Sequence, residues 1–192
     1  MHDRSGLLLS SSPRLSDEDI NQAELVGIVE ATVWAKSARL DPKKFKFWQR
    51  LHQRMFGQVW DWAGEWREHE PNIGVPPHDI QSKLKVLQDD LAFWLSDECE
   101  MPALELVARF HHRLVLVHPF SDGNGRWGRL MTDVLAAREL GLSPLTWAAS
   151  SGDLRDSESE ERKIYIAAIK AADRGDFSPL MDYLSNLNAE LA

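Results

Sequence analysis

The chain has 192 residues, of which 43% are hydrophobic, a formal net charge of −8 and a single cysteine, Cys99. This length fits one sizeable core and is short for two. The acidic balance argues against a general nucleic-acid binder, which needs an excess of Lys and Arg, and one cysteine excludes an internal disulfide. No apolar run approaches the ~18 residues that cross a bilayer, so we expect no membrane contact and a reducing, cytoplasmic compartment.

Helical periodicity recurs along most of the chain, after a Ser-rich stretch over residues 1–15 that we expect to be a loose, flexible tail. Ser16 followed by three acidic residues predicts the start of a helix over about 17–37. Asp41-Pro42 predicts a second start, and Gly57 its end. Further helices are predicted over about 79–96, 102–118, 123–141, 157–169 and 180–191.

Residues 57–78 break this pattern. Trp60, Trp62 and Trp66 alternate with polar residues, and glycines and three prolines follow. Such a stretch favours a short hairpin or an extended flap. The sequence therefore predicts an all-α domain with one small β-hairpin.

The segment from His118 to Arg129 lies between two predicted helices, and its residue types predict an anion site. Gly123 and Gly125 lack Cβ atoms, so the backbone can approach a ligand closely. A helix begins there, and its first N–H groups, backed by the positive end of the helix dipole, suit a diphosphate. Arg126 and Arg129 are three residues apart, share one helix face, and can hold the outer phosphates.

Three further side chains extend this site. Asp122 would be repelled by phosphate unless a cation mediated, so it is a candidate ligand for Mg²⁺. Asn124 can donate its side-chain amide to a phosphate oxygen. His118 stands at the edge of the site, where a neutral imidazole could accept a proton from a hydroxyl that attacks phosphorus.

The segment resembles the Fic family motif His-Pro-Phe-x-(Asp/Glu)-Gly-Asn-Gly-Arg-x-x-Arg and matches it at every fixed position. Residues 110–113, and Trp62 to Arg67 upstream, also look like features of this family. Residues 54–60 and 72–77 look most like the Fic branch called mobile mystery protein B. The resemblance implies an all-α Fic fold, a helical bundle with a small β-hairpin flap, forming one domain over 16–192 with its core at about 40–142.

The resemblance also implies an activity: a protein adenylyltransferase that uses ATP and Mg²⁺ to move AMP onto a Ser, Thr or Tyr hydroxyl of a target protein. By this analogy His118 is the general base and Asp122 holds the metal. Gly123, Asn124 and Gly125 cradle the phosphates, while Arg126 and Arg129 bind the outer ones.

Two regulatory features are implied by the same resemblance. The flap that holds the target segment as an added strand corresponds to residues 66–75, including Asn72, Ile73, Gly74 and Val75. Many Fic proteins carry an inhibitory helix with the pattern (Ser/Thr)-x-x-x-Glu-(Gly/Asn). The nearest match lies in the first helix, 17–37, at Glu30, although Val26 and Ala31 depart from the pattern. We expect Glu30 to pair with Arg129.

Two alternatives stay open at this point. A Fic-fold phosphotransferase would move phosphate instead of AMP, and a nucleotide-binding interaction module would not turn over. The expected partners are a protein substrate and, for a toxin-like member, an antitoxin or other regulatory partner. A homo-oligomer is left open.

Overall fold

The computed structural model describes residues 5–8, 15–70, 73–143, 145, 147 and 160–189, with side chains described up to residue 185. Its helices run in the order α1 (Asp17–Ser37), α2 (Phe45–Phe56), η1 (Pro77–Asp79), α3 (Ile80–Trp94), α4 (Ala103–Val117), α5 (Asn124–Glu139), α6 (Glu160–Ala172) and α7 (Ser178–Ala189). The described residues hold no named strand, only an isolated antiparallel bridge between Leu7 and Trp60. The all-α prediction is confirmed.

Helix α1 begins where the sequence predicts. The Ser16 hydroxyl accepts the Asp19 backbone N–H at 3.1 Å, and the Ser16 N–H donates to the Asp19 carboxylate at 2.9 Å. This reciprocal capping box satisfies two N–H groups that the first turn leaves unpaired. The predicted start of α2 at Asp41-Pro42 is wrong by three residues, because the Asp41 carboxylate accepts the Lys43 N–H at 2.8 Å and forms a turn before Phe45.

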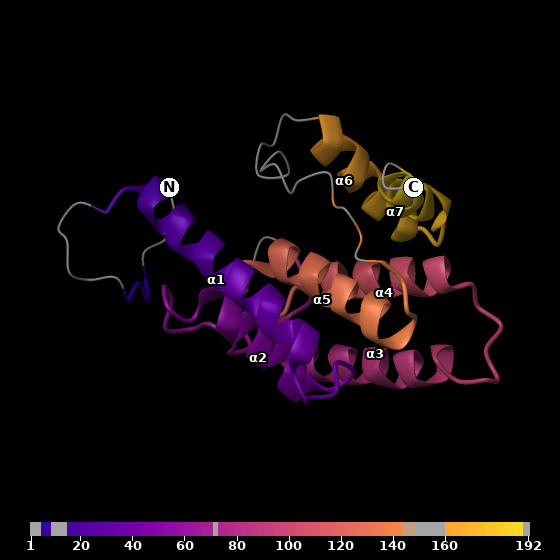
Figure 1. Ribbon diagram of the computed structural model, residues 1–192, viewed down its shortest axis with the longest axis horizontal. Helices are drawn as coiled ribbons and strands as arrows, with labels where there is room; N and C mark the ends of the chain where they lie inside the picture. The colour runs from indigo at the N-terminus through magenta and orange to yellow at the C-terminus, as the bar shows by residue number, and fades with distance from the viewer. Residues whose placement is uncertain are drawn as a thin grey trace.

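Helices α1 to α5 form the main bundle, and α6 and α7 form a second group that packs on it (Figure 1). Helix α1 lies across α2 and reaches α5, while α4 packs between α3 and α5. The main core is formed largely by aromatic side chains, including Trp48, Phe56, Phe110 and Trp127. Helices α6 and α7 pack on each other and lie over α4, and a second apolar cluster joins them to it. In this arrangement, residues of α1, of the start of α5 and of α6 line one pocket.

The expected hairpin over residues 57–78 is not formed in the described part of that stretch, which contains turns and bends instead. Its ends bond to the chain beside the motif: the Arg67 N–H donates to the Pro119 carbonyl at 2.9 Å, and the Val75 N–H to the Val117 carbonyl at 3.4 Å. Pairing to the α4–α5 connection therefore replaces the pairing of two flap strands. The hairpin prediction did not foresee this long-range pairing.

Part of the expected loose tail is bonded to this same stretch. The Leu8 N–H donates to the Val59 carbonyl at 2.8 Å, and the Asp61 N–H to the Gly6 carbonyl at 2.9 Å. Residues 1–4 and 9–14 lie outside the described residues, as does the predicted capping box at 157–159. Among the helices that are described, none combines the length and the apolar character needed to cross a membrane.

Candidate functional site

The predicted motif residues meet at one pocket of about 540 Å³ between α1, the α4–α5 connection and α6. All seven side chains or backbones assigned from the sequence line it: His118, Asp122, Gly123, Asn124, Gly125, Arg126 and Arg129. The other lining residues come from α1 (Asn21), from the flap stretch (Ile73), and from α4 and α6 (Val115, Arg162, Tyr165, Ile166). The α6 wall was not foreseen, because it lies more than thirty residues beyond the motif.

The connection between α4 and α5 is held by two left-handed residues. His118 ends α4 with φ 52° and ψ 60°, an unusual conformation for a residue with a side chain. Gly123 begins α5 with φ 74°, and a Cβ there would lie 2.6 Å from the Phe56 ring, so only glycine fits. The connection is thereby turned so that the first N–H groups of α5 open into the pocket.

Asn124 has a different role from the one predicted. Its side-chain oxygen accepts the Phe120 N–H at 2.8 Å, and its amide donates to the Phe120 carbonyl at 2.7 Å. The side chain is buried. It closes the motif loop on itself, so the predicted donation from this amide to a phosphate is corrected, and the backbone N–H at the start of α5 is the donor that Asn124 could offer an anion.

A histidine outside the motif supports the same loop. The His52 Nδ1 accepts the Gly64 N–H at 3.0 Å, so the proton sits on Nε2, which donates to the Asp122 carbonyl at 3.0 Å. Its ring stacks on Phe120 with centroids 3.7 Å apart. Burial lowers the pKa of His52 to about 3, so it stays neutral and keeps this tautomer. The Asp122 contact spans 70 residues of chain, and no local pattern signals it.

His118 fits the part of a base. Burial is the main cause that lowers its pKa, with the nearby Arg67 guanidinium acting in the same direction. The imidazole is therefore neutral near pH 7 and able to accept a proton. Its backbone is fixed by Arg67, whose Nε donates to the His118 carbonyl at 2.7 Å.

Arg67 also closes the flap stretch, since its guanidinium donates to the carbonyls of His69 and Val75. It is almost fully buried and bonds only carbonyl oxygens in these contacts. Of the four predicted flap residues, Ile73 lines the pocket and is 62% exposed. Gly74 lies against His118, Val75 bonds Val117, and Asn72 lies outside the described residues.

Arg126 is bonded to a carboxylate from α1. Its Nη1 donates to Glu24, and its guanidinium lies 4.7 Å from the centre of the Phe56 ring. Glu24 is 1% exposed and also accepts the Trp60 indole N–H at 2.7 Å. The Glu24 carboxylate thus binds the Arg126 guanidinium, which the sequence analysis assigned to an outer phosphate.

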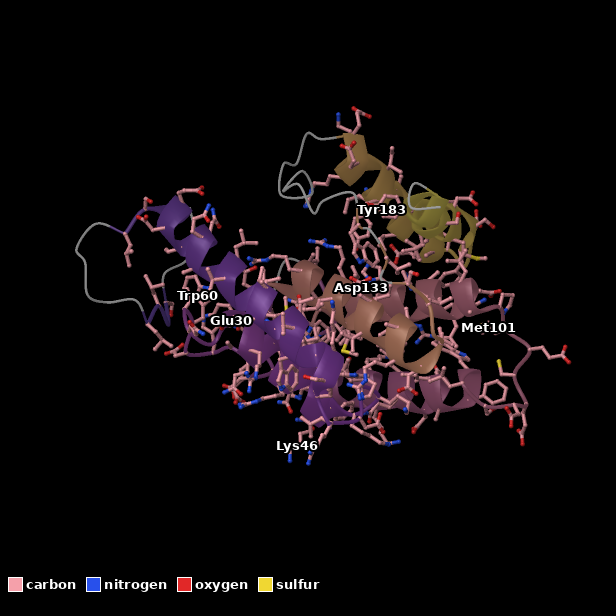
Figure 2. The ribbon with its side chains drawn as sticks, in the orientation of Figure 1. Glu30, Lys46, Trp60, Met101, Asp133 and Tyr183 are labelled. Carbon is pink, nitrogen blue, oxygen red and sulfur yellow. The ribbon has the colours of Figure 1, made fainter. Side chains whose placement is uncertain are left out.

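The predicted pair of Glu30 with Arg129 is not formed. Glu30, labelled on α1 in Figure 2, is exposed and accepts the Gln58 side-chain amide at 3.0 Å. Six residues turn a helix by about 600°, so Glu30 points about 120° away from Glu24. Glu24 shares the buried face of α1 with Gly27, where a Cβ would lie 2.3 Å from the Met55 carbonyl oxygen. Gly27 thus lets α1 approach α2 closely, which brings Glu24 to the site.

Arg129 has the surroundings expected of an anion-binding group. Within the described residues its guanidinium forms no hydrogen bond or ion pair, and burial lowers its pKa. The nearby Asp133 gives little compensation, because burial raises the pKa of that carboxyl to about 7. A largely buried cation without a bonded anion favours binding of a negatively charged ligand.

The α6 wall is fixed to the motif helix by a chain of hydrogen bonds. The Thr132 hydroxyl donates to the Gly128 carbonyl at 2.7 Å, so it accepts from the His111 Nδ1 at 3.0 Å. The His111 Nε2 then accepts from the Tyr165 hydroxyl at 2.8 Å. This chain holds Tyr165 beside Arg129 in the wall of the pocket.

The pocket fits a magnesium-bound nucleotide in two respects. Asp122 is exposed and is the only carboxylate among the described lining residues, and no described cluster of three metal-ligating residues occurs. One carboxylate suffices for Mg²⁺ when phosphates and water complete its octahedral shell. At Gly125, the one atom near an added Cβ would be Arg129 Nη1 at 3.7 Å, so protein packing does not explain this glycine. The space beside its backbone is open to a ligand in the pocket.

Comparisons with known proteins agree with this geometry. Residues 44–136 match the Fic/DOC family. The protein adenylyltransferase fic-1 of Caenorhabditis elegans is 32% identical over 142 residues, which cover 70% of this chain and 25% of the relative. The chain therefore spans about a quarter of the length of this curated relative.

Solved structures share the fold. Fic-1 of C. elegans, solved over its residues 134–508, matches with a TM-score of 0.70 and 26% identity, covering 91% of this chain and 50% of that one. The N-terminal Fic domain of a VirB-translocated effector from Bartonella quintana, solved with bound ADP, matches with a TM-score of 0.66 over 97% of this chain and 95% of that one. Its identity is 18%, so that likeness concerns the fold alone.

Proposed function

We propose that this chain, which matches the Fic/DOC family over residues 44–136, transfers AMP from ATP to a hydroxyl group of a target protein. The observation that carries the proposal is the meeting of a neutral imidazole, the N-terminus of α5 and the unpaired Arg129 at one pocket. The C. elegans relative is a protein adenylyltransferase, which supports the same reaction. The narrower likeness to the mobile mystery protein B branch stays a prediction.

In the proposed reaction, His118 accepts the proton of the target hydroxyl while the hydroxyl oxygen forms a bond to the α-phosphorus. The bond from that phosphorus to the oxygen bridging the β-phosphate breaks, and pyrophosphate leaves with the electron pair. Arg129 and the first N–H groups of α5 stabilise the charge on the departing phosphates. Asp122 would hold Mg²⁺, which would supply further positive charge at these phosphates.

The flap stretch would present the target. Ile73 is exposed at the pocket, and Gly74 lies against His118, so a chain segment placed along residues 73–75 would bring a hydroxyl near the imidazole. Pairing through main-chain groups would tolerate many target side chains.

The test uses ATP labelled at either the α- or the γ-phosphate, incubated with the full chain and a protein extract. Label that reaches protein only from the α-position supports AMP transfer. Label from the γ-position favours the phosphotransferase. Label from neither position, in the wild type and in the Glu24→Gln variant described below, favours a binding module. His118→Ala is the control for the base, and Asp122→Asn the control for the metal.

We further propose that Glu24 restrains this activity by occupying Arg126. Its carboxylate bonds the guanidinium from a buried position, so a phosphate would have to displace it to reach Arg126. Glu24→Gln keeps an oxygen for the Trp60 N–H and removes the charge that holds Arg126. Glu30→Gln is the matched control on the same helix. Faster transfer by the Glu24 variant alone supports the restraint, and equal rates in both variants would exclude it.

A further inference from the structure

Helix α1 has apolar side chains on two opposite faces. One face, with Ile20, Gly27, Ala31 and Ala35, is buried against the bundle. The other carries four residues that stay largely exposed: Leu25 at 49%, Val26 at 55%, Val29 at 57% and Val33 at 65%. An apolar face of a helix normally packs against a partner, and here the bundle covers only one of the two apolar faces of α1.

The four exposed residues form one continuous stripe. At about 100° per residue, Leu25, Val26, Val29 and Val33 fall within an arc of roughly 100°, opposite the buried face. Glu18 and Lys36 lie in the same arc at the two ends of the helix, and both are exposed. They are the only charged residues in that arc, so the stripe is neutral although the chain carries a net charge of −8.

The order of these residues makes the stripe complementary to itself. When two copies of α1 lie antiparallel about an axis close to Val26 and Val29, residues whose numbers sum to about 54 face each other. Leu25 of each copy then faces Val29 of the other with Val26 beside this pair, Val33 faces Gln22, and Glu18 of each copy faces Lys36 of the other. The acidic first turn of one helix also approaches the C-terminus of the second, so the two helix dipoles oppose. A two-fold contact requires this self-complementarity.

We propose that the stripe of Leu25, Val26, Val29 and Val33 is an interface through which two copies of this chain pair along antiparallel α1 helices. Apolar burial between the stripes supplies the attraction, and the two Glu18–Lys36 contacts fix the direction. A single helix pair is a small interface, so the dimer dissociates on dilution. Because Glu24 lies on the opposite face of α1, pairing also holds in place the helix that binds Arg126.

Sedimentation velocity of the full chain, from about 1 to about 200 µM, tests this pairing without reference to catalysis. The wild type is expected to move from monomer to dimer with rising concentration. Val29→Asp is expected to weaken the dimer at least tenfold, because each copy then buries a carboxylate in the stripe. Val86→Asp, on α3 at a position 48% exposed, is the matched control and should dimerise as the wild type does. Circular dichroism checks that each variant is folded.

A charge exchange tests the direction of pairing. Lys36→Glu and Glu18→Lys should each weaken the dimer by setting like charges opposite, whereas the double variant restores opposite charges and should recover most of the affinity. A wild type that stays monomeric across the range would overturn the proposal. So would a dimer that Val29→Asp leaves intact, or a double variant no better than either single one.

Discussion

Replacing Glu24 by glutamine should release Arg126 and change activity and stability in opposite directions. The carboxylate is 1% exposed and accepts two hydrogen bonds, one from Arg126 and one from the Trp60 indole. Glutamine has the same shape and keeps one oxygen, so Trp60 retains its acceptor. The charge-assisted bond to Arg126 is the interaction that is lost.

The size of the effect follows from that bond. A hydrogen bond between charged groups contributes about 1.5–3 kcal/mol. If a phosphate must displace Glu24, the same energy opposes nucleotide binding, so Glu24→Gln should tighten ATP binding by up to about 10- to 150-fold. The folded state loses the same bond when no nucleotide is present. For a chain of this length the melting temperature should then fall by about 3–12 °C.

Two assays on the same variant measure these effects. Isothermal titration with ATP and Mg²⁺ gives the affinity, and thermal unfolding without nucleotide gives the stability. Glu30→Gln should change neither, because that side chain is exposed and contacts Gln58. Lower stability with unchanged ATP affinity would refute the restraint, since Glu24 would then be a structural residue only.

Three further predictions concern the pocket and the residues around it. His118→Ala should lower the rate of AMP transfer by about 10²- to 10⁴-fold with ATP binding retained. Because the pKa of His118 is lowered, kcat/KM of the wild type should fall only as the pH drops below 6.5. A fall that begins above this pH would contradict the assigned base. Gly125→Ala should leave stability unchanged or raise it by up to about 1 kcal/mol, because an added Cβ meets no protein atom closer than 3.7 Å. The same Cβ should weaken ATP binding by filling space in the pocket. Unfolding of the variant would contradict this reading. The folded-state pKa of Asp133 is raised to about 7, so the wild type loses stability as the pH rises from about 4 to about 7, because the carboxyl ionises first in the unfolded chain. Asp133→Asn lacks this loss and should gain stability relative to the wild type over that range. An equal difference in unfolding free energy between the two proteins at both pH values would argue against it.

Local chemistry made much of the site predictable. The residues from His118 to Arg129 adjoin one another in the chain, and proline, glycine and a new helix define their geometry within a single turn. They meet at one pocket as expected. The helices were also predictable, since their apolar periodicity and caps lie within each segment, apart from the turn that delays α2 to Phe45.

Contacts between distant segments were not predictable in the same way. His52 and Arg67 support the motif across roughly fifty residues or more, and α6 closes the pocket from beyond the family segment. The predicted Glu30–Arg129 contact is wrong because the inhibitory pattern reflects residue types and carries no information about which face of α1 is buried. The small residues Gly27, Ala31 and Ala35 mark the buried side of α1, and Glu24 lies on that side.

Intact mass spectrometry of a modified target tests the central claim most directly. The full chain, released by Glu24→Gln, is incubated with ATP, Mg²⁺ and an acceptor protein, and the modified peptide is sequenced. Attachment of one AMP group to a Ser, Thr or Tyr side chain, absent when His118 is replaced by alanine, is the predicted result. A phosphate on that side chain, or AMP attached equally well without the imidazole, would contradict it.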